Sequence, residues 1–168
     1  MSNTSATRIL GVDPGLNVSG YGVLEVGPSG LRLCEAGVVR GTPRAPMVDR
    51  LLEIYNGIVD VVQSLRPTCV AIEELYSHYE RPRTSILMGH ARGVICLAAA
   101  QAELPVHSYS ATQVKRILTG NGRAPKSQVQ LAIEQELNLG APPEPADVAD
   151  ALAIAVCHHY LADKLAVT

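Results

Sequence analysis

Residues 8–15 read Arg8-Ile9-Leu10-Gly11-Val12-Asp13-Pro14-Gly15, a short apolar run that ends on a carboxylate and a Pro-Gly break. Such a run predicts a buried strand, and the break predicts a turn. A second apolar run, at 21–26, predicts the returning strand of a hairpin. Because a carboxylate at the end of a buried strand is costly to desolvate, Asp13 indicates that a cation or hydrogen bonds compensate it there.

The remaining chain predicts alternating strands and helices. Apolar runs predict three further strands, at 31–40, 68–74 and 106–109. Helical signals predict five helices, at 46–65, 84–103, 110–118, 125–139 and 146–164. A strand that follows a helix is typical of a crossover in a partly parallel sheet, so the predicted fold class is α/β. The 84–103 helix is apolar all round after Gly93, which favours burial on more than one side.

Composition predicts one soluble domain spanning residues 1–168. The chain is 47% apolar and 18% charged, as in globular proteins. No apolar stretch follows Met1, and the longest apolar run, 94–100, is too short to cross a bilayer, so we expect a cytoplasmic protein without a membrane partner. The cysteines stand in apolar segments without a CxxC pair, which favours buried reduced thiols; they are Cys34, Cys69, Cys96 and Cys157.

Charge is distributed unevenly along the chain. The net charge is −2, yet residues 80–127 contain seven basic and two acidic side chains. The basic ones are Arg81, Arg83, Arg92, Lys115, Arg116, Arg123 and Lys126. This segregation favours a basic surface for nucleic acid, with a solvated face that has no partner as the alternative.

Three further carboxylates stand where they could meet Asp13. Glu73 lies near the end of the 68–74 strand, and Asp147 and Asp150 share one face of the first turn of the last helix. An isolated Asp-x-x-Asp is explained by ordinary helix-start chemistry. Alternating alanines after Asp147, however, would let this helix press against a sheet. Four converging carboxylates would need cations between them, and oxygen ligands select Mg²⁺ or Mn²⁺, which support phosphodiester cleavage.

These motifs resemble those of RuvC-type Holliday-junction resolvases. The matching stretches are Gly11-Val12-Asp13-Pro14-Gly15, Gly20-Tyr21-Gly22-Val23, Ala71-Ile72-Glu73-Glu74, Ala91-Arg92-Gly93, Gln113-Val114-Lys115, Lys126-Ser127-Gln128-Val129 and Asp147-Val148-Ala149-Asp150-Ala151-Leu152-Ala153. The resemblance spans 8–158 and implies a ribonuclease H-like three-layer fold with a mixed central sheet flanked by helices. It also implies an endonuclease of recombination and repair that nicks two opposing strands of a four-way DNA junction symmetrically.

The resemblance assigns roles to single residues. The family's metal-binding carboxylates match Asp13, Glu73, Asp147 and Asp150. Two Mg²⁺ per site are implied, with Mn²⁺ expected to substitute. Lys126 and Lys115 match basic residues implicated in catalysis or DNA contact, and Tyr76 falls where the family has an aromatic at the junction centre. We expect the phosphate contacts to be Arg81, Arg83, Arg92, Lys115, Arg123 and Lys126.

The resemblance also implies partners. A homodimer would meet the two-fold symmetry of a junction, and a branch-migration helicase complex would be a further partner. Gly89 and Gly93 lie on one face of the 84–103 helix and permit close approach, so residues 89–100 are the candidate interface.

Other interpretations compete at several positions. The Asp13 hairpin also fits the phosphate loop of actin-like ATPases, but the chain leaves no room for their second domain. Residues 120–127 approach a phosphate loop, except that Pro125 removes a donor N–H where a second glycine belongs. A binding-only module would not need the acids.

Two aromatic and imidazole features have more than one interpretation. Tyr76 fits either a core position or a stacking role beside Tyr79. His158 and His159 predict a cation near a helix C-terminus together with a packed imidazole, rather than metal ligands.

Overall fold

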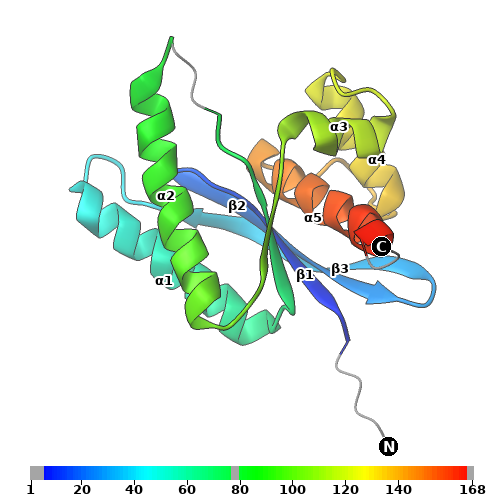
Figure 1. The fold of residues 1–168 in the computed structure, drawn as a ribbon, viewed down its shortest axis with the longest axis horizontal. Coiled ribbons are helices and arrows are strands. Elements are labelled where there is room, and N and C mark those ends of the chain that lie inside the picture. Colours follow the sequence, from blue (N-terminus) through cyan, green and yellow to red (C-terminus); the bar gives the residue numbers. More distant parts are fainter. Residues whose placement is uncertain (1–5, 77–79, 166–168) are drawn as a thin grey trace, which may run out of the picture.

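The computed structural model describes residues 6–76 and 80–165 and places a five-stranded mixed sheet between two layers of helices (Figure 1). The strands are β1 (Arg8–Asp13), β2 (Val18–Gly27), β3 (Gly30–Arg40), β4 (Cys69–Glu73) and β5 (Val106–Tyr109). The helices are α1 (Met47–Leu65), α2 (Pro82–Gln101), α3 (Ala111–Thr119), α4 (Lys126–Glu136) and α5 (Ala146–Leu165). These elements follow the order that the apolar periodicity predicts.

The sheet has the strand order β3-β2-β1-β4-β5. β1 and β3 each pair antiparallel with β2, whereas β4 pairs parallel with β1 and with β5. The predicted α/β class, crossover and mixed sheet are therefore confirmed. Because β1, β4 and β5 are parallel, their carboxyl ends meet at one edge, which is where open α/β sheets bind ligands.

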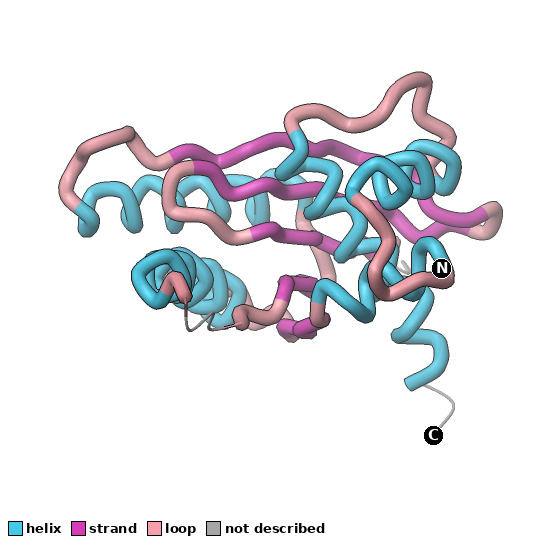
Figure 2. Tube along the Cα trace, turned by 90° about the horizontal axis from the view of Figure 1, so that it is seen from above, coloured by secondary structure: helices cyan, strands magenta, loops and turns pink. Residues whose placement is uncertain are grey.

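The two faces of the sheet carry different helices. α1 and α2 cover one face, and α5, flanked by α3 and α4, covers the other (Figures 1 and 2). Strand alternation sorts the side chains: Leu10 and Val12 pack in the α1–α2 layer, and Ile9 packs in the α5 layer. The same alternation places Asp13, at the end of β1, on the α5 side.

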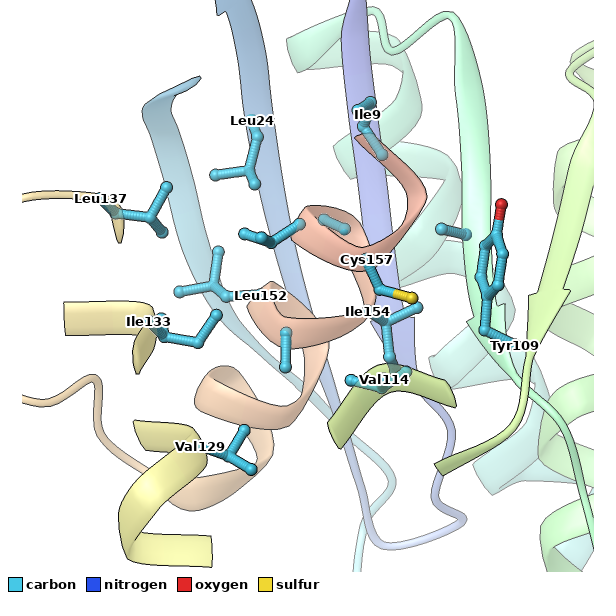
Figure 3. Close-up of a cluster of buried hydrophobic side chains, with 14 of the residues drawn as sticks. Ile9, Leu24, Tyr109, Val114, Val129, Ile133, Leu137, Leu152, Ile154 and Cys157 are labelled. Atoms are coloured by element: carbon cyan, nitrogen blue, oxygen red, sulfur yellow. The ribbon is translucent and has the colours of Figure 1, made fainter. Parts of the chain in front are cut away.

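α5 is buried from Ala151 to His158 and forms the centre of its layer. Figure 3 shows Leu152 and Ile154 of this helix in one apolar cluster with Ile9 of β1 and Ile133 of α4. Contact with atoms on both sides explains why the helix lacks a polar face. This burial fixes the rotation of α5 about its axis and hence the direction of its first turn.

Glycines in the sheet allow α5 to approach closely. A Cβ added at Gly11 would lie 2.1 Å from the Ala151 carbonyl oxygen, and one at Gly20 would lie 2.0 Å from the Asp147 carbonyl oxygen. Any side chain there would push the helix off the sheet. The alanines of α5 predict close packing from the sequence, but the packing also requires the glycines of β1 and β2.

α2 differs from its prediction. Ala91, Ile95 and Ala98 are buried, but Ile86 is 59% exposed and Leu97 is 51% exposed. Burial on more than one side is therefore wrong for the single chain. The reason is that an apolar composition shows that a face can be covered without showing what covers it.

Two sequence predictions, the buried reduced cysteines and the absence of a membrane-spanning segment, can be compared with the structure. All four cysteines are free; Cys69 and Cys157 are buried, while Cys34 and Cys96 are only partly buried, so full burial is wrong for those two. Within residues 6–76 and 80–165, no helix has the length and apolar character needed to cross a membrane.

Candidate active site

Asp13 is the last residue of β1, the central strand of the sheet. Its partner across the β1–β2 pair is Gly20, the glycine that lies against the backbone of Asp147. The turn after Asp13 is held by Ser19, whose Oγ accepts from the Gly15 N–H at 3.0 Å and donates to the Gly15 carbonyl at 2.8 Å. Asp13 is thus fixed beside the start of α5.

Glu73 is the last residue of β4, one strand away from Asp13. The β1–β4 register pairs Val12 with Ile72, so the two carboxylates follow at the same edge. Period-two alternation places Glu73 on the face of Ala71, which packs in the α5 layer. Asp13 and Glu73 therefore share an edge and a face, as the two strand patterns predict.

Asp147, in the first turn of α5, and Asp150, on the turn that follows, complete an acidic cluster. Burial, followed by the charges of Asp150, Glu73 and Asp147, raises the pKa of Asp13 to about 7. Burial and then Asp150 also raise the pKa of Glu73. The other three predicted carboxylates consequently all lie within electrostatic reach of Asp13, and their repulsion opposes its ionisation.

Lys126, the first residue of α4, supplies a positive charge to this cluster. Its Nζ donates to Asp150 Oδ2 at 2.9 Å, and this hydrogen bond raises the pKa of Lys126. Lys115 of α3 lies close enough to Glu73 to offset part of the upward shift of its pKa. A cavity of about 160 Å³ is bounded by Glu73, Asp150 and both lysines, over an apolar floor that includes Val129.

The chemistry of the cluster suits hard divalent cations, because its donors are all carboxylate oxygens that repel one another. Among the described residues, no three His, Cys, Asp or Glu side chains are gathered into a ready-made ligand set. Asp150 instead turns toward Lys126. Metal binding would therefore have to draw the carboxylates together and release Asp150 from the lysine.

A larger cavity of about 590 Å³ opens beside the acids. Its lining includes Asp13, Glu73, Leu75, Tyr76, Arg81, Thr84, Met88, Arg92 and Thr112. Tyr76 is 63% exposed, so the core interpretation of this residue is wrong. An acidic edge next to an exposed aromatic ring and an arginine could hold a phosphodiester together with an unstacked base.

Comparison with known proteins identifies the family of the chain. The family model described as Crossover junction endodeoxyribonuclease RuvC matches residues 9–158. The chain belongs to the RuvC family. The protein of that name from Rhodopirellula baltica is 56% identical over 162 residues, covering 95% of this chain and 90% of the relative. The one from Pelotomaculum thermopropionicum is 44% identical over 154 residues, covering 90% and 93%.

Solved structures agree with this membership. The structure described as T. thermophilus RuvC in complex with Holliday junction substrate matches with a TM-score of 0.88 and 36% identity, covering 94% of this chain and 96% of that one. The yeast mitochondrial Holliday junction resolvase Ydc2 has the same fold, with a TM-score of 0.60 at 13% identity. The protein is thus a crossover junction endodeoxyribonuclease with a ribonuclease H-like fold, which settles the first hairpin in favour of the nuclease interpretation.

The predicted DNA contacts of this RuvC-family chain do not all converge. Arg83 and Arg123 are exposed and line neither cavity; the Arg123 backbone N–H donates to Asn121 Oδ1 at 2.9 Å. Tyr79 lies outside the described residues. Arg92 is engaged within the fold, because its Nε donates to the Glu73 carbonyl at 3.2 Å and its Nη2 donates to Ser108 Oγ at 2.8 Å.

A second polar cluster surrounds His158, in the C-terminal half of α5. Tyr109 Oη lies 2.7 Å from His158 Nδ1, and Cys69 Sγ lies 3.4 Å from His158 Nε2. Burial, then the neighbouring His107 and His159, lower the pKa of His158 to about 4. His158 is therefore neutral and buried, which fits the packed imidazole predicted for this pair of histidines.

Proposed function

We propose that the protein resolves four-way DNA junctions by nicking two opposing strands symmetrically with two Mg²⁺ per site, held by Asp13, Glu73, Asp147 and Asp150. The observation that carries this proposal is the crowding of three carboxylates around Asp13 at the end of the central strand. The relative solved with a Holliday junction supports the choice of substrate. Mn²⁺ has the same preference for carboxylate oxygens and should substitute.

The chain's own residues set up the chemistry. Bound divalent ions would supply an activated water and stabilisation of the leaving oxygen. Asp13 carries a raised pKa, so near neutral pH it holds a proton part of the time, and metal binding should release that proton. Lys126, once Asp150 turns to a metal, is free to contact a phosphate at the edge of the site.

The basic residues would position the DNA. Arg81 and Tyr76 line the cavity beside Asp13, where the ring offers a stacking surface at the junction centre. Lys115 and Lys126 stand at the acidic cluster, and exposed Arg83 and Arg123 would extend phosphate contacts away from it. Such contacts predict an affinity that falls steeply with salt.

A homodimer would place one site on each of two equivalent strands. α2 supports this arrangement, because Ile86, His90, Gly93 and Leu97 recur at spacings of four and three and are all exposed. A Cβ added at Gly93 would meet no atom within 4 Å, so a second subunit could approach there. We place the dimer interface on this stripe, within the 89–100 stretch and its continuation to Ile86.

Two further features complete the proposal. The four free thiols support a cytoplasmic location. A branch-migration helicase complex is the proposed protein partner, since a resolvase acts on junctions that such a motor moves.

Cleavage of a synthetic four-way junction tests the proposal directly. Incubated with Mg²⁺, the protein should nick two opposing arms at matching positions and leave a linear duplex of the same sequence intact. Asp13→Asn should bind the junction and not cut it. An intact junction after long incubation with either metal would contradict the proposal, and cutting of the duplex at the same rate would contradict structure selectivity.

A further inference from the structure

Arg92 has a role that differs from those of the other basic residues near the site. Its side chain makes two hydrogen bonds within the chain, to the Glu73 carbonyl oxygen and to Ser108 Oγ. It belongs to α2, between the buried Ala91 and the exposed Gly93, and its side chain is only partly exposed. Its guanidinium group therefore reaches the end of β4 from the face of the sheet opposite α5.

The peptide that Arg92 contacts controls the direction of the Glu73 side chain. Its carbonyl oxygen accepts from Arg92, and its N–H, which belongs to Glu74, donates to the Tyr109 carbonyl at 2.8 Å. One peptide plane is thus held from both ends. Because this peptide starts at the Cα of Glu73, its rotation would swing the carboxylate relative to Asp13.

The neighbouring strand cannot supply this hydrogen bond in the same way. The β1–β4 ladder ends with the pair Val12 and Ile72, and the residue that follows the end of β1 is Pro14, which has no N–H to donate. A carbonyl at a buried strand end needs a donor. The Nε of Arg92 provides one, and Ser108 fixes the guanidinium to β5 at the same time.

We infer that Arg92 is a positioning residue: it holds the last peptide of β4 so that the Glu73 carboxylate faces the acidic cluster, and it does not bind a DNA phosphate. The inference rests on the proposed function, in which Glu73 is a metal ligand. Partners that orient a metal ligand are worth about 10- to 100-fold in metal affinity or activity.

The two roles for Arg92 predict opposite results. A phosphate contact would survive in Arg92→Lys, which keeps the charge, whereas Arg92→Met would weaken junction binding and lower the salt slope by about one. A positioning residue makes no contact with DNA, so both variants should bind junction DNA as the wild type does. Its role does require the forked guanidinium, which lysine cannot replace. Both should lose about 10- to 100-fold in single-turnover cleavage and in Mn²⁺ affinity.

The experiment measures three quantities for the wild type, Arg92→Met, Arg92→Lys and Ser108→Ala. They are the junction Kd against salt without divalent metal, Mn²⁺ binding by calorimetry on the DNA-free protein, and single-turnover cleavage. Ser108→Ala removes only the second hydrogen bond and should cause a smaller loss, and the double variant with Arg92→Met should lose no more than Arg92→Met alone. Arg66→Gln, an equal loss of charge on an exposed residue just before the start of β4, is the matched control and should leave all three unchanged.

The outcomes distinguish failure of the proposed function from failure of the positioning role of Arg92. A wild type that does not cut the junction would defeat the proposed function. A wild type that cuts, with Arg92→Met and Arg92→Lys that cut and bind Mn²⁺ equally well, would overturn the positioning role. Junction binding that is weak in Arg92→Met and normal in Arg92→Lys would overturn it in favour of a phosphate contact. If Arg92→Met does not fold, Arg92→Lys and Ser108→Ala carry the same test.

Discussion

Polar side chains from both ends of α5 lie near β4, but only those near the C-terminal end have complete hydrogen bonds. Near the start of α5, Asp147 and Asp150 lie close to Asp13, and Lys126 forms an ion pair with Asp150. Toward the other end, both ring nitrogens of His158 have partners in Tyr109 and Cys69. A buried polar group whose hydrogen bonds are complete stabilises a fold, whereas a crowd of like charges lacks a counter-charge that a ligand can supply.

Burial favours the uncharged form of both Asp13 and His158, but the consequences differ. The pKa of Asp13 rises to about 7 and that of His158 falls to about 4. Both ring nitrogens of neutral His158 have partners in the fold, so this cluster needs no ligand. Asp13 is held in a state that divalent cations would reverse, and we take this difference as the mark of a functional end and a structural end.

The largest expected effect comes from removing the charge at the functional end. Asp13→Asn should lower junction cleavage by about a thousandfold or more, because metal-ion stabilisation of a transition state is worth several kcal/mol. The same variant should raise the free energy of unfolding at pH 8 in EDTA, since it removes a buried charge repelled by three neighbours. Cleavage kinetics and urea denaturation check both signs. A destabilised Asp13→Asn would show that the comparison of the two ends is mistaken.

At the structural end, His158→Leu should act on stability alone. The substitution leaves the Tyr109 hydroxyl without its partner, so the free energy of unfolding should fall by about 2–4 kcal/mol. Cleavage by the folded fraction should remain near that of the wild type. Urea denaturation measures the first quantity, and single-turnover kinetics well below the midpoint measures the second. A selective loss of cleavage without loss of stability would contradict the division between the ends.

The pH dependence of stability should separate the two ends by sign. For Asp13 the folded pKa of about 7 exceeds 3.8, so the folded state binds more protons and stability falls as pH rises between about 4 and 7. For His158 the folded pKa of about 4 lies below 6.5, so stability rises with pH between about 4 and 6.5. In EDTA, Asp13→Asn should abolish the fall in stability, which amounts to about 4 kcal/mol between pH 4 and pH 7. His158→Leu should abolish the rise and retain the fall. Equal pH profiles for both variants would refute this assignment.

The smallest expected effect on stability comes from Lys126→Met. The Lys126 side chain is 66% exposed, so its ion pair with Asp150 should contribute less than about 1 kcal/mol to folding. If Lys126 instead acts at the site, its loss should tighten Mn²⁺ binding in the DNA-free protein and slow cleavage. Calorimetry and kinetics on one preparation test this pair of signs. A stability loss well above 1 kcal/mol would make Lys126 part of the fold.

The sequence predicts the acidic end better than the histidine end for a physical reason. Asp13 and Glu73 each end an apolar strand, and strand alternation with a parallel crossover brings such ends together. Close approach of α5 depends on Gly11 and Gly20, whose role is visible only when the helix is placed on them.

Other contacts depend on partners that no local pattern connects. His158 contacts Tyr109 and Cys69, and Arg92 contacts the carbonyl of Glu73, across segments far apart in the chain. Charge segregation identifies Arg92 as basic but cannot tell a guanidinium turned toward DNA from one turned toward a backbone oxygen. The wrong prediction for α2 has the same cause, because apolar residues predict burial without identifying the partner that buries them.

Thermal unfolding against Mg²⁺ or Mn²⁺ concentration tests the central claim most directly, with Asp13→Asn measured beside the wild type. If the four carboxylates form a divalent-cation site, the Tm of the wild type should rise steadily through the millimolar range of either ion, and the Tm of Asp13→Asn should stay nearly constant. A wild-type Tm that does not respond to either ion, or an equal rise in both proteins, would contradict the account.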